Sequence, residues 1–206
     1  AYDANGNVTS VTPPGKSAHT FTYTPVDLQA TYTPPDIGIG DTSTRYSYNL
    51  DRQLTLVDRP DGKSISLSYD GAGRLSSVAS PDGSTSLTYN GETGQLVSIQ
   101  GGDGTTTGYT YDGFLPLSES WSGGVNGNIT RAFNNDFQLA SVAVSGGSTV
   151  PYTYDNDGLL TGVGSLTLSR GASNGLLESV ILGSVADSYT YNSFGEVSNY
   201  TAAYPA

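Results

Sequence analysis

Residues 69–89 read YDGAGRLSSVASPDGSTSLTY and contain the pattern on which the rest of the chain is built. The stretch begins with tyrosine and aspartate, continues through a glycine and a leucine to a Pro-Asp-Gly turn, and ends on the next tyrosine. Related stretches recur along the chain with a period of about 21 residues, and such self-similarity is the signature of a repeat architecture.

Each repeat unit starts at an aromatic residue, which we call the anchor. The anchors are Tyr2, Tyr23, Tyr48, Tyr69, Tyr89, Tyr111, Phe133, Tyr154 and Tyr191. The gap between the last two anchors is long enough for one more unit, and we expect a degenerate unit near residues 166–170, where no aromatic residue is present. About nine units therefore make up a single array over residues 1–206.

The residues after each anchor predict a tight chain reversal. Asp or Asn follows most anchors, and such side chains accept hydrogen bonds from turn backbone. A glycine follows a few residues later, where the turn requires a positive φ angle. These turn glycines are Gly6, Gly73, Gly94, Gly158 and Gly195.

The rest of each unit predicts two β-strands. The residues that lead to an anchor alternate between apolar and Ser or Thr side chains, as in Leu67 and Tyr69, which indicates a strand with one apolar face. The strand after the turn carries aliphatic residues three apart, as in Leu75 and Val78, and this spacing predicts a β-bulge or a kink between them. The fold class is all-β, with tandem β-hairpins in a curved antiparallel sheet.

Two stretches depart from the pattern. Residues 24–45 are rich in proline and lengthen one unit, which predicts an enlarged loop rather than a domain boundary. Residues 119–133 contain Trp121, the only tryptophan, outside the repeat phase. We interpret Trp121 as a candidate contact for a sugar or a protein partner, or as a plug over an open end of the sheet.

The composition excludes several classes of function. The net charge is −11 and the eight basic residues are scattered, which disfavours binding to nucleic acid or to an anionic membrane surface. No run of apolar residues is long enough to span a bilayer, and the absence of cysteine excludes disulfides and thiolate metal sites. An acidic, cysteine-free chain rich in Gly, Thr and Tyr is typical of exported bacterial proteins, so we expect a secreted or cell-surface location.

The sequence gives little support for catalysis or for a cofactor. His19 is the only histidine and is expected on a strand surface. The carboxylates considered for pairing by folding are Asp58 with Asp61, Glu92, and Glu178 with Asp187, and turn caps and solvated edges explain them better than an acid–base pair. The stretch GGDGTTTGY at residues 101–109 does not match the calcium-binding nonapeptide repeat. We predict no enzyme activity, no metal and no cofactor.

The repeat unit resembles a known family. The stretch quoted above is similar to the YD repeat of the Rhs family, and so are YDANGNVTSVTPPG, YDNDGLLTGVG and YNSFGEV elsewhere in the chain. The stretch LTLSRGASNGLLESVIL at residues 166–182 resembles the weaker unit that such proteins place between two clear repeats. No match is found to the Rhs core segment that carries self-cleaving aspartates, nor to a toxin domain.

The resemblance implies a fold and a role. In this family, long repeat arrays wind into a spiral sheet that closes as a hollow shell, which encloses a C-terminal toxin in bacterial toxins and forms part of an adhesion receptor in teneurins. We therefore expect a non-catalytic stretch of such a shell, with the rest of the shell and its enclosed polypeptide as partners. The alternative is a cell-surface adhesion or carbohydrate-binding module. Open sheet edges also predict self-association.

Overall fold

The computed structural model describes residues 1–38 and 40–204. Its contacts divide the chain into two units, Ala1–Thr107 and Gly108–Ala206, which we call unit 1 and unit 2. The described residues form nineteen strands and no helix, which confirms the all-β prediction. None of them therefore belongs to a helix that could cross a membrane.

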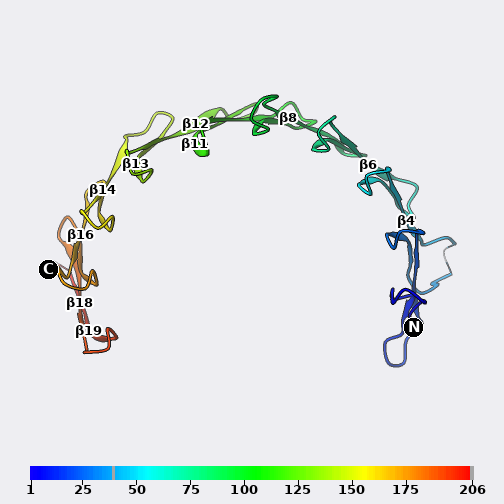
Figure 1. Ribbon diagram of the computed structural model, residues 1–206, viewed down its shortest axis with the longest axis horizontal. Coiled ribbons are helices and arrows are strands. Elements are labelled where there is room, and N and C mark those ends of the chain that lie inside the picture. Colours follow the sequence, from blue (N-terminus) through cyan, green and yellow to red (C-terminus); the bar gives the residue numbers. More distant parts are fainter. Residues whose placement is uncertain (39, 205–206) are drawn as a thin grey trace. The chain divides into compact units, whose positions relative to one another are not determined.

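Both units are built from short strands in chain order (Figure 1). Unit 1 contains β1 (Ser10–Val11), β2 (His19–Tyr23), β3 (Gln29–Thr33), β4 (Thr44–Tyr48), β5 (Leu54–Asp58), β6 (Ser64–Tyr69), β7 (Leu75–Ser80), β8 (Gly83–Tyr89) and β9 (Leu96–Gln100). The strand β10 (Thr106–Asp112) contains the boundary. Unit 2 continues with β11 (Leu115–Ser122), β12 (Gly127–Phe133), β13 (Leu139–Val144), β14 (Val150–Tyr154), β15 (Leu160–Val163), β16 (Leu166–Arg170), β17 (Leu177–Leu182), β18 (Val185–Tyr191) and β19 (Val197–Ala203).

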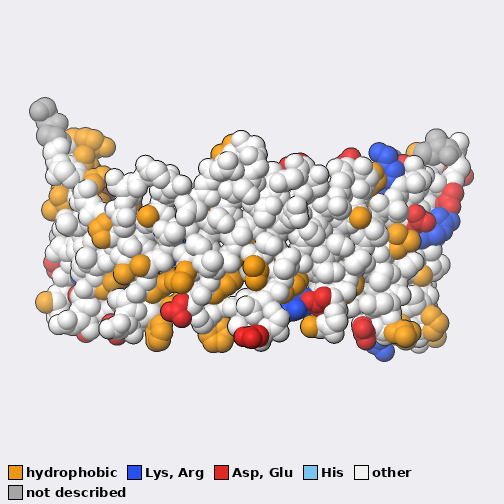
Figure 2. Space-filling view, turned by 90° about the horizontal axis from the view of Figure 1, so that it is seen from above, with side chains coloured by type: hydrophobic (Ala, Val, Ile, Leu, Met, Phe, Trp, Pro, Cys, Tyr) orange, Lys and Arg blue, Asp and Glu red, His pale blue; other side chains and the backbone are white. Residues whose placement is uncertain are grey.

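Each unit is a single layer of antiparallel strands. Within a unit, a strand contacts only the strands that precede and follow it in the chain. No described hydrophobic side chain is fully buried, and orange side chains are visible at the surface in Figure 2. The chain exposes 13411 Å², whereas a compact protein of its mass exposes about 9,100 Å². The apolar side chains of each layer are thus only half covered.

The two faces of each layer differ in chemistry. In β6, the apolar Ile65, Leu67 and Tyr69 are half-buried, and the serines between them are exposed. The same alternation recurs in β2, β4, β8 and β18. We call the side that carries the anchors the tyrosine face.

A β-bulge lies beside the anchors, where the spacing of aliphatic residues predicts it. Tyr69 pairs with Leu75 and Leu67 pairs with Val78, so one extra residue is accommodated in β7. Because Leu67 and Tyr69 share a face, the bulge returns Leu75 and Val78 to that same face. Equivalent shifts occur at Tyr23, Tyr48, Tyr89, Phe133, Tyr154, Arg170 and Tyr191.

One prediction about the organisation was wrong. Residues 24–45 are not one enlarged loop, because residues 29–33 form β3, which pairs with both β2 and β4. The sequence hides this strand because its unit lacks an aliphatic residue at the usual position. The lengthened connection is confined to residues 34–43, of which Ile39 lies outside the described residues.

Candidate functional site

Six of the eight anchor tyrosines make the same hydrogen bond, and they occur in both units. The hydroxyl of Tyr69 donates a hydrogen bond to the carbonyl oxygen of Leu54, at the start of the preceding strand. Equivalent bonds of 2.6–3.0 Å join Tyr23 to Val8, Tyr48 to Gln29, Tyr89 to Leu75, Tyr154 to Leu139 and Tyr191 to Leu177. The anchors are therefore polar ties between neighbouring strands as well as apolar side chains.

The strand pairing explains why a hydroxyl is needed there. Backbone pairing between β5 and β6 ends at Leu56 and Ser66, so the Leu54 carbonyl lies beyond the last pair. A half-buried carbonyl without a partner costs stability, and the tyrosine hydroxyl supplies that partner. The pairing of β7 with β8 likewise ends at Ser77, two residues after Leu75.

Arg170 replaces tyrosine in the degenerate unit. It ends β16, pairs with Leu177 across a bulge and so occupies the anchor position. Its Nε donates a bond of 3.1 Å to the carbonyl oxygen of Leu160, as an anchor hydroxyl does elsewhere. A second guanidinium nitrogen donates to the carbonyl oxygen of Gly175 in the following turn. The degenerate unit thus has an anchor with the usual hydrogen bond, but the anchor is the cation Arg170 instead of an aromatic residue.

The loops after the anchors, which we call anchor turns, share one hydrogen-bond pattern. The side chain of the first residue accepts bonds from the backbone N–H groups of the third and fifth, as Asp70 does from Ala72 and Arg74. The fourth residue has a positive φ angle of 77° at Gly73. The turn glycines Gly6, Gly94, Gly158 and Gly195 also have positive φ, so all five predicted glycines have the predicted conformation.

In several turns the first and fifth side chains form complementary pairs. Where the first residue is Asn, its amide donates to an acceptor, as Asn49 does to Gln53 and Asn192 to Glu196. Where it is Asp, it accepts from a donor, as Asp70 does from Arg74.

Side chains also connect one anchor turn to the next. Gln53 donates a bond of 2.6 Å to the carbonyl oxygen of Gly73, and Gln138 donates a bond of 3.1 Å to that of Gly158. A Cβ atom on Gly158 would lie 2.9 Å from Gln138 Nε2, so glycine also makes room for this contact. This lacing of successive turns was not predicted, although the repeated Asn-x-x-x-Gln spacing signals it.

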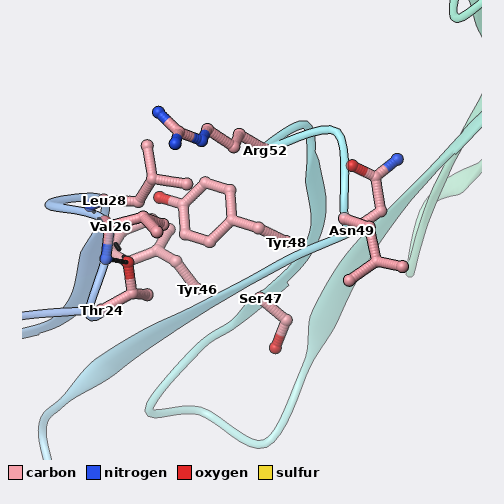
Figure 3. A pocket seen from close by; sticks show the side chains of 9 residues that line it. Thr24, Val26, Leu28, Tyr46, Ser47, Tyr48, Asn49 and Arg52 are labelled. Carbon is pink, nitrogen blue, oxygen red and sulfur yellow. Dashed lines mark hydrogen bonds between the residues drawn. The ribbon is translucent and has the colours of Figure 1, made fainter.

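A pocket of about 400 Å³ opens between two anchor turns of unit 1 (Figure 3). Tyr46 and Tyr48 line it from β4, and Val26 and Leu28 line it from the preceding turn. The Arg52 side chain extends along its margin toward Leu28. The lining offers apolar surface and one cation, but no pair of acidic groups.

Trp121 lies on the tyrosine face of unit 2. It pairs with Gly127 on β12, and a Cβ atom on Gly127 would lie 2.7 Å from its ring. The indole therefore covers the backbone of its own hairpin and is half-buried. The proposed role of Trp121 as a sugar or partner contact stays a prediction, because this position also serves the packing of the hairpin.

The repeat geometry agrees with a comparison to known families. The family model described as teneurin YD-shell matches residues 1–205. The chain belongs to the YD-shell family. No curated protein matches it.

Solved structures share the YD-shell fold at low identity. The structure titled TcdB2-TccC3-Cdc42 matches at 16% identity and a TM-score of 0.57, over 96% of this chain and 13% of that one. The Photorhabdus luminescens Tc holotoxin pore matches at 16% identity and a TM-score of 0.49, over 98% of this chain and 14% of that one. This YD-shell chain thus spans about an eighth of the proteins that it resembles.

Several carboxylates of this YD-shell chain, among them Asp3, Asp70 and Asp155, accept hydrogen bonds within its turns. Every described carboxyl whose pKa departs from its ordinary value has that pKa lowered, which is the opposite of what a general acid needs. Bonds from the Asn7 side chain lower the pKa of Asp3, and bonds from the Arg74 side chain lower that of Asp70. In the carboxylate pairs that the sequence suggests, Asp61 forms an ion pair with Arg59, and Asp187 accepts a hydrogen bond from the Tyr200 hydroxyl. His19 is half-buried and stacks on Tyr32.

Proposed function

We propose that this chain forms part of the wall of a YD-repeat shell that encloses or presents another polypeptide, such as a C-terminal toxin. The observation that carries the proposal is the single layer with a half-exposed tyrosine face and no buried hydrophobic side chain among the described residues. Such a layer acts as a partition rather than as a globular core. Family membership supports the same role.

The mechanism that we propose is steric. Consecutive antiparallel strands leave no unpaired edge inside a unit, and the anchor hydroxyls and turn lacing tie the strands where backbone pairing ends. Proteases need an extended segment that can detach, and a laced sheet offers few such segments. A polypeptide behind such a wall is protected from cleavage and kept away from its targets.

We also propose a secreted or cell-surface location and a toxin-like context. The structure titled TcdB2-TccC3-Cdc42 matches this chain with a TM-score of 0.57, and this similarity supports a shared fold. The acidic composition rich in Gly, Thr and Tyr, which is typical of exported bacterial proteins, supports this location. The rest of the shell and its enclosed polypeptide are the expected partners.

Limited proteolysis of the intact native protein tests the proposal. Under native conditions, a second polypeptide should survive a protease that digests it rapidly once the sheet is unfolded by denaturant. Digestion of all non-repeat sequence at the same rate in both conditions would contradict an enclosing role. Binding to a glycan array that disappears in Trp121→Ala would instead support the adhesion or carbohydrate-binding alternative.

A further inference from the structure

The strained positions of the anchor turns single out one residue. Among the described residues, Asp27, Arg52 and Phe137 are the three non-glycine residues with positive φ, between 61° and 64°. All three occupy the fourth position of an anchor turn, where four other turns use glycine (Gly6, Gly73, Gly158 and Gly195). Each one therefore accepts strain that glycine would remove.

Interactions with neighbouring residues explain why two of these three positions are not glycine. Asp27 accepts bonds of 2.8 Å from the side chains of Asn5 and Asn7, in the preceding anchor turn. Arg52 extends along the pocket of Figure 3 and lies close enough to Asp27 to lower its pKa, although the bonds from Asn5 and Asn7 contribute more. Asp27 thus laces its turn to the one before, whereas Arg52 interacts with that turn through its charge.

Phe137 has no comparable compensation within its turn. Its side chain offers no hydrogen bond and is 74% exposed. Phe114, in the preceding turn, is 99% exposed. Strain and exposure of a large apolar ring both oppose folding, and their combination at one position indicates a binding role.

The two phenylalanines line one pocket. Phe114, Leu115 and Phe137 surround a space of about 380 Å³, which also contacts Asp112 and Gly113. A second hollow continues from Phe137 and Leu115 along the tyrosine face to Phe133 and Arg131. The space is large enough for one bulky apolar side chain together with its backbone.

The charges around this pocket select the ligand. Asp112 lines it, and Asp136 directly precedes Phe137 in the chain and lines a separate polar hollow with Asp155 and Asp157. Unit 2 contains eight acidic and two basic residues. Of those two, Arg131 lines the second hollow together with Asp112, and Arg170 is held by backbone carbonyls, so among the described residues Arg131 is the one cation beside Asp112 and Asp136. The rim is therefore acidic, which disfavours a second copy of this acidic chain.

We propose that the pocket between Phe114 and Phe137 binds a basic, apolar polypeptide segment. An aliphatic or aromatic side chain of that segment enters between the two rings, and a neighbouring lysine or arginine lies beside Asp112 and Asp136. This site is independent of whether the chain encloses a polypeptide. Its ligand class follows from the apolar lining and the acidic rim.

Fluorescence anisotropy on the intact protein tests the site. The probe is a short labelled peptide that alternates lysine with leucine, and its matched control alternates glutamate with leucine. The lysine peptide should bind and the glutamate peptide should not, with affinity falling as salt is raised. Phe137→Gly should weaken binding by at least about tenfold, because it removes one of the two rings.

The Phe137→Gly variant separates binding from folding. Because glycine relieves the strain, this variant should unfold at a temperature equal to or above that of the wild type, so lost binding is not lost structure. Arg52→Gly makes the same change at the equivalent position of unit 1 and should leave binding unchanged. Equal binding of the lysine peptide to wild type and Phe137→Gly, or equal binding of both peptides to the wild type, would overturn the proposal.

Discussion

The hydroxyl of Tyr69 lies 2.8 Å from the carbonyl oxygen of Leu54, at the point where β5 and β6 no longer pair through their backbones. Removing this hydroxyl in Tyr69→Phe leaves the ring in place but the carbonyl without its donor. We expect a loss of about 1 kcal/mol in the free energy of unfolding, measured by denaturant titration. Tyr46→Phe is the matched control, because the described residues offer its hydroxyl no hydrogen bond. Equal stability of the two variants would show that the tie contributes nothing.

Arg170 provides a second test of the same tie. Arg170→Leu removes the bonds to Leu160 and Gly175 and should destabilise unit 2 by about 1–3 kcal/mol. Arg170→Tyr restores the usual anchor and should recover part of that loss through a hydroxyl bond to Leu160. Thermal unfolding of the three proteins should therefore rank the leucine variant lowest. If the tyrosine variant were no more stable than the leucine variant, position 170 would not be an anchor.

The left-handed position of the anchor turns predicts opposite effects at Arg52 and Gly73. Arg52→Gly removes the strain of a φ of 64° and should raise the free energy of unfolding by up to about 1 kcal/mol. The variant also loses the charge interaction of Arg52 with Asp27, which reduces this gain. Gly73→Ala places a side chain at a φ of 77° and should lower stability by about 1 kcal/mol or more. Denaturant titration measures both changes. A destabilised Arg52→Gly would mean that the lacing outweighs the strain.

Acid should weaken the connection between β3 and β4 through Asp41. Bonds from the Arg45 side chain lower the pKa of Asp41 from 3.8 to about 2. Because the pKa of Asp41 is lower in the folded state than in the unfolded state, the ionised carboxylate stabilises the fold above pH 3.8. This contribution is lost as the pH falls toward about 2. Wild type should therefore exceed Asp41→Asn in stability at neutral pH, and the difference should shrink over that acid range. A difference that does not change with pH would contradict this assignment.

Local features of the fold could be predicted from sequence because they depend on neighbouring residues. The turn glycines have the expected φ angles because the Asx side chain and the reversal lie within five residues. The bulge beside each anchor follows from two aliphatic residues three apart that must share one face. Period and alternation are enough to fix these features.

Features that depend on partners in another repeat could not be read in the same way. The acceptor of the Tyr69 hydroxyl is a backbone carbonyl, which has no sequence signature of its own. Arg170 was missed because the pattern sought an aromatic ring, whereas the fold requires a donor that reaches Leu160. The strand β3 was missed because Gln29 replaces the usual aliphatic residue and still offers its carbonyl to Tyr48.

The candidate sites show the same division. Trp121 was singled out for its rarity, but its position over Gly127 depends on a cross-strand pairing that only the structure gives. Phe114 and Phe137 attracted no notice in sequence, since each is one of five phenylalanines. The signal at Phe137 is a bulky residue where the repeat prescribes glycine, and its meaning depends on the ring of Phe114 in the turn before.

Mass spectrometry of the native gene product is the most direct test of an enclosing wall. The product is measured intact under native and denaturing conditions, and the peptides that it releases are sequenced. An enclosing wall predicts one native particle that separates on denaturation into the repeat chain and a distinct, non-repeat polypeptide. A single uncleaved chain with no retained second polypeptide, leading into a wall or membrane anchor, would contradict it and favour an adhesin.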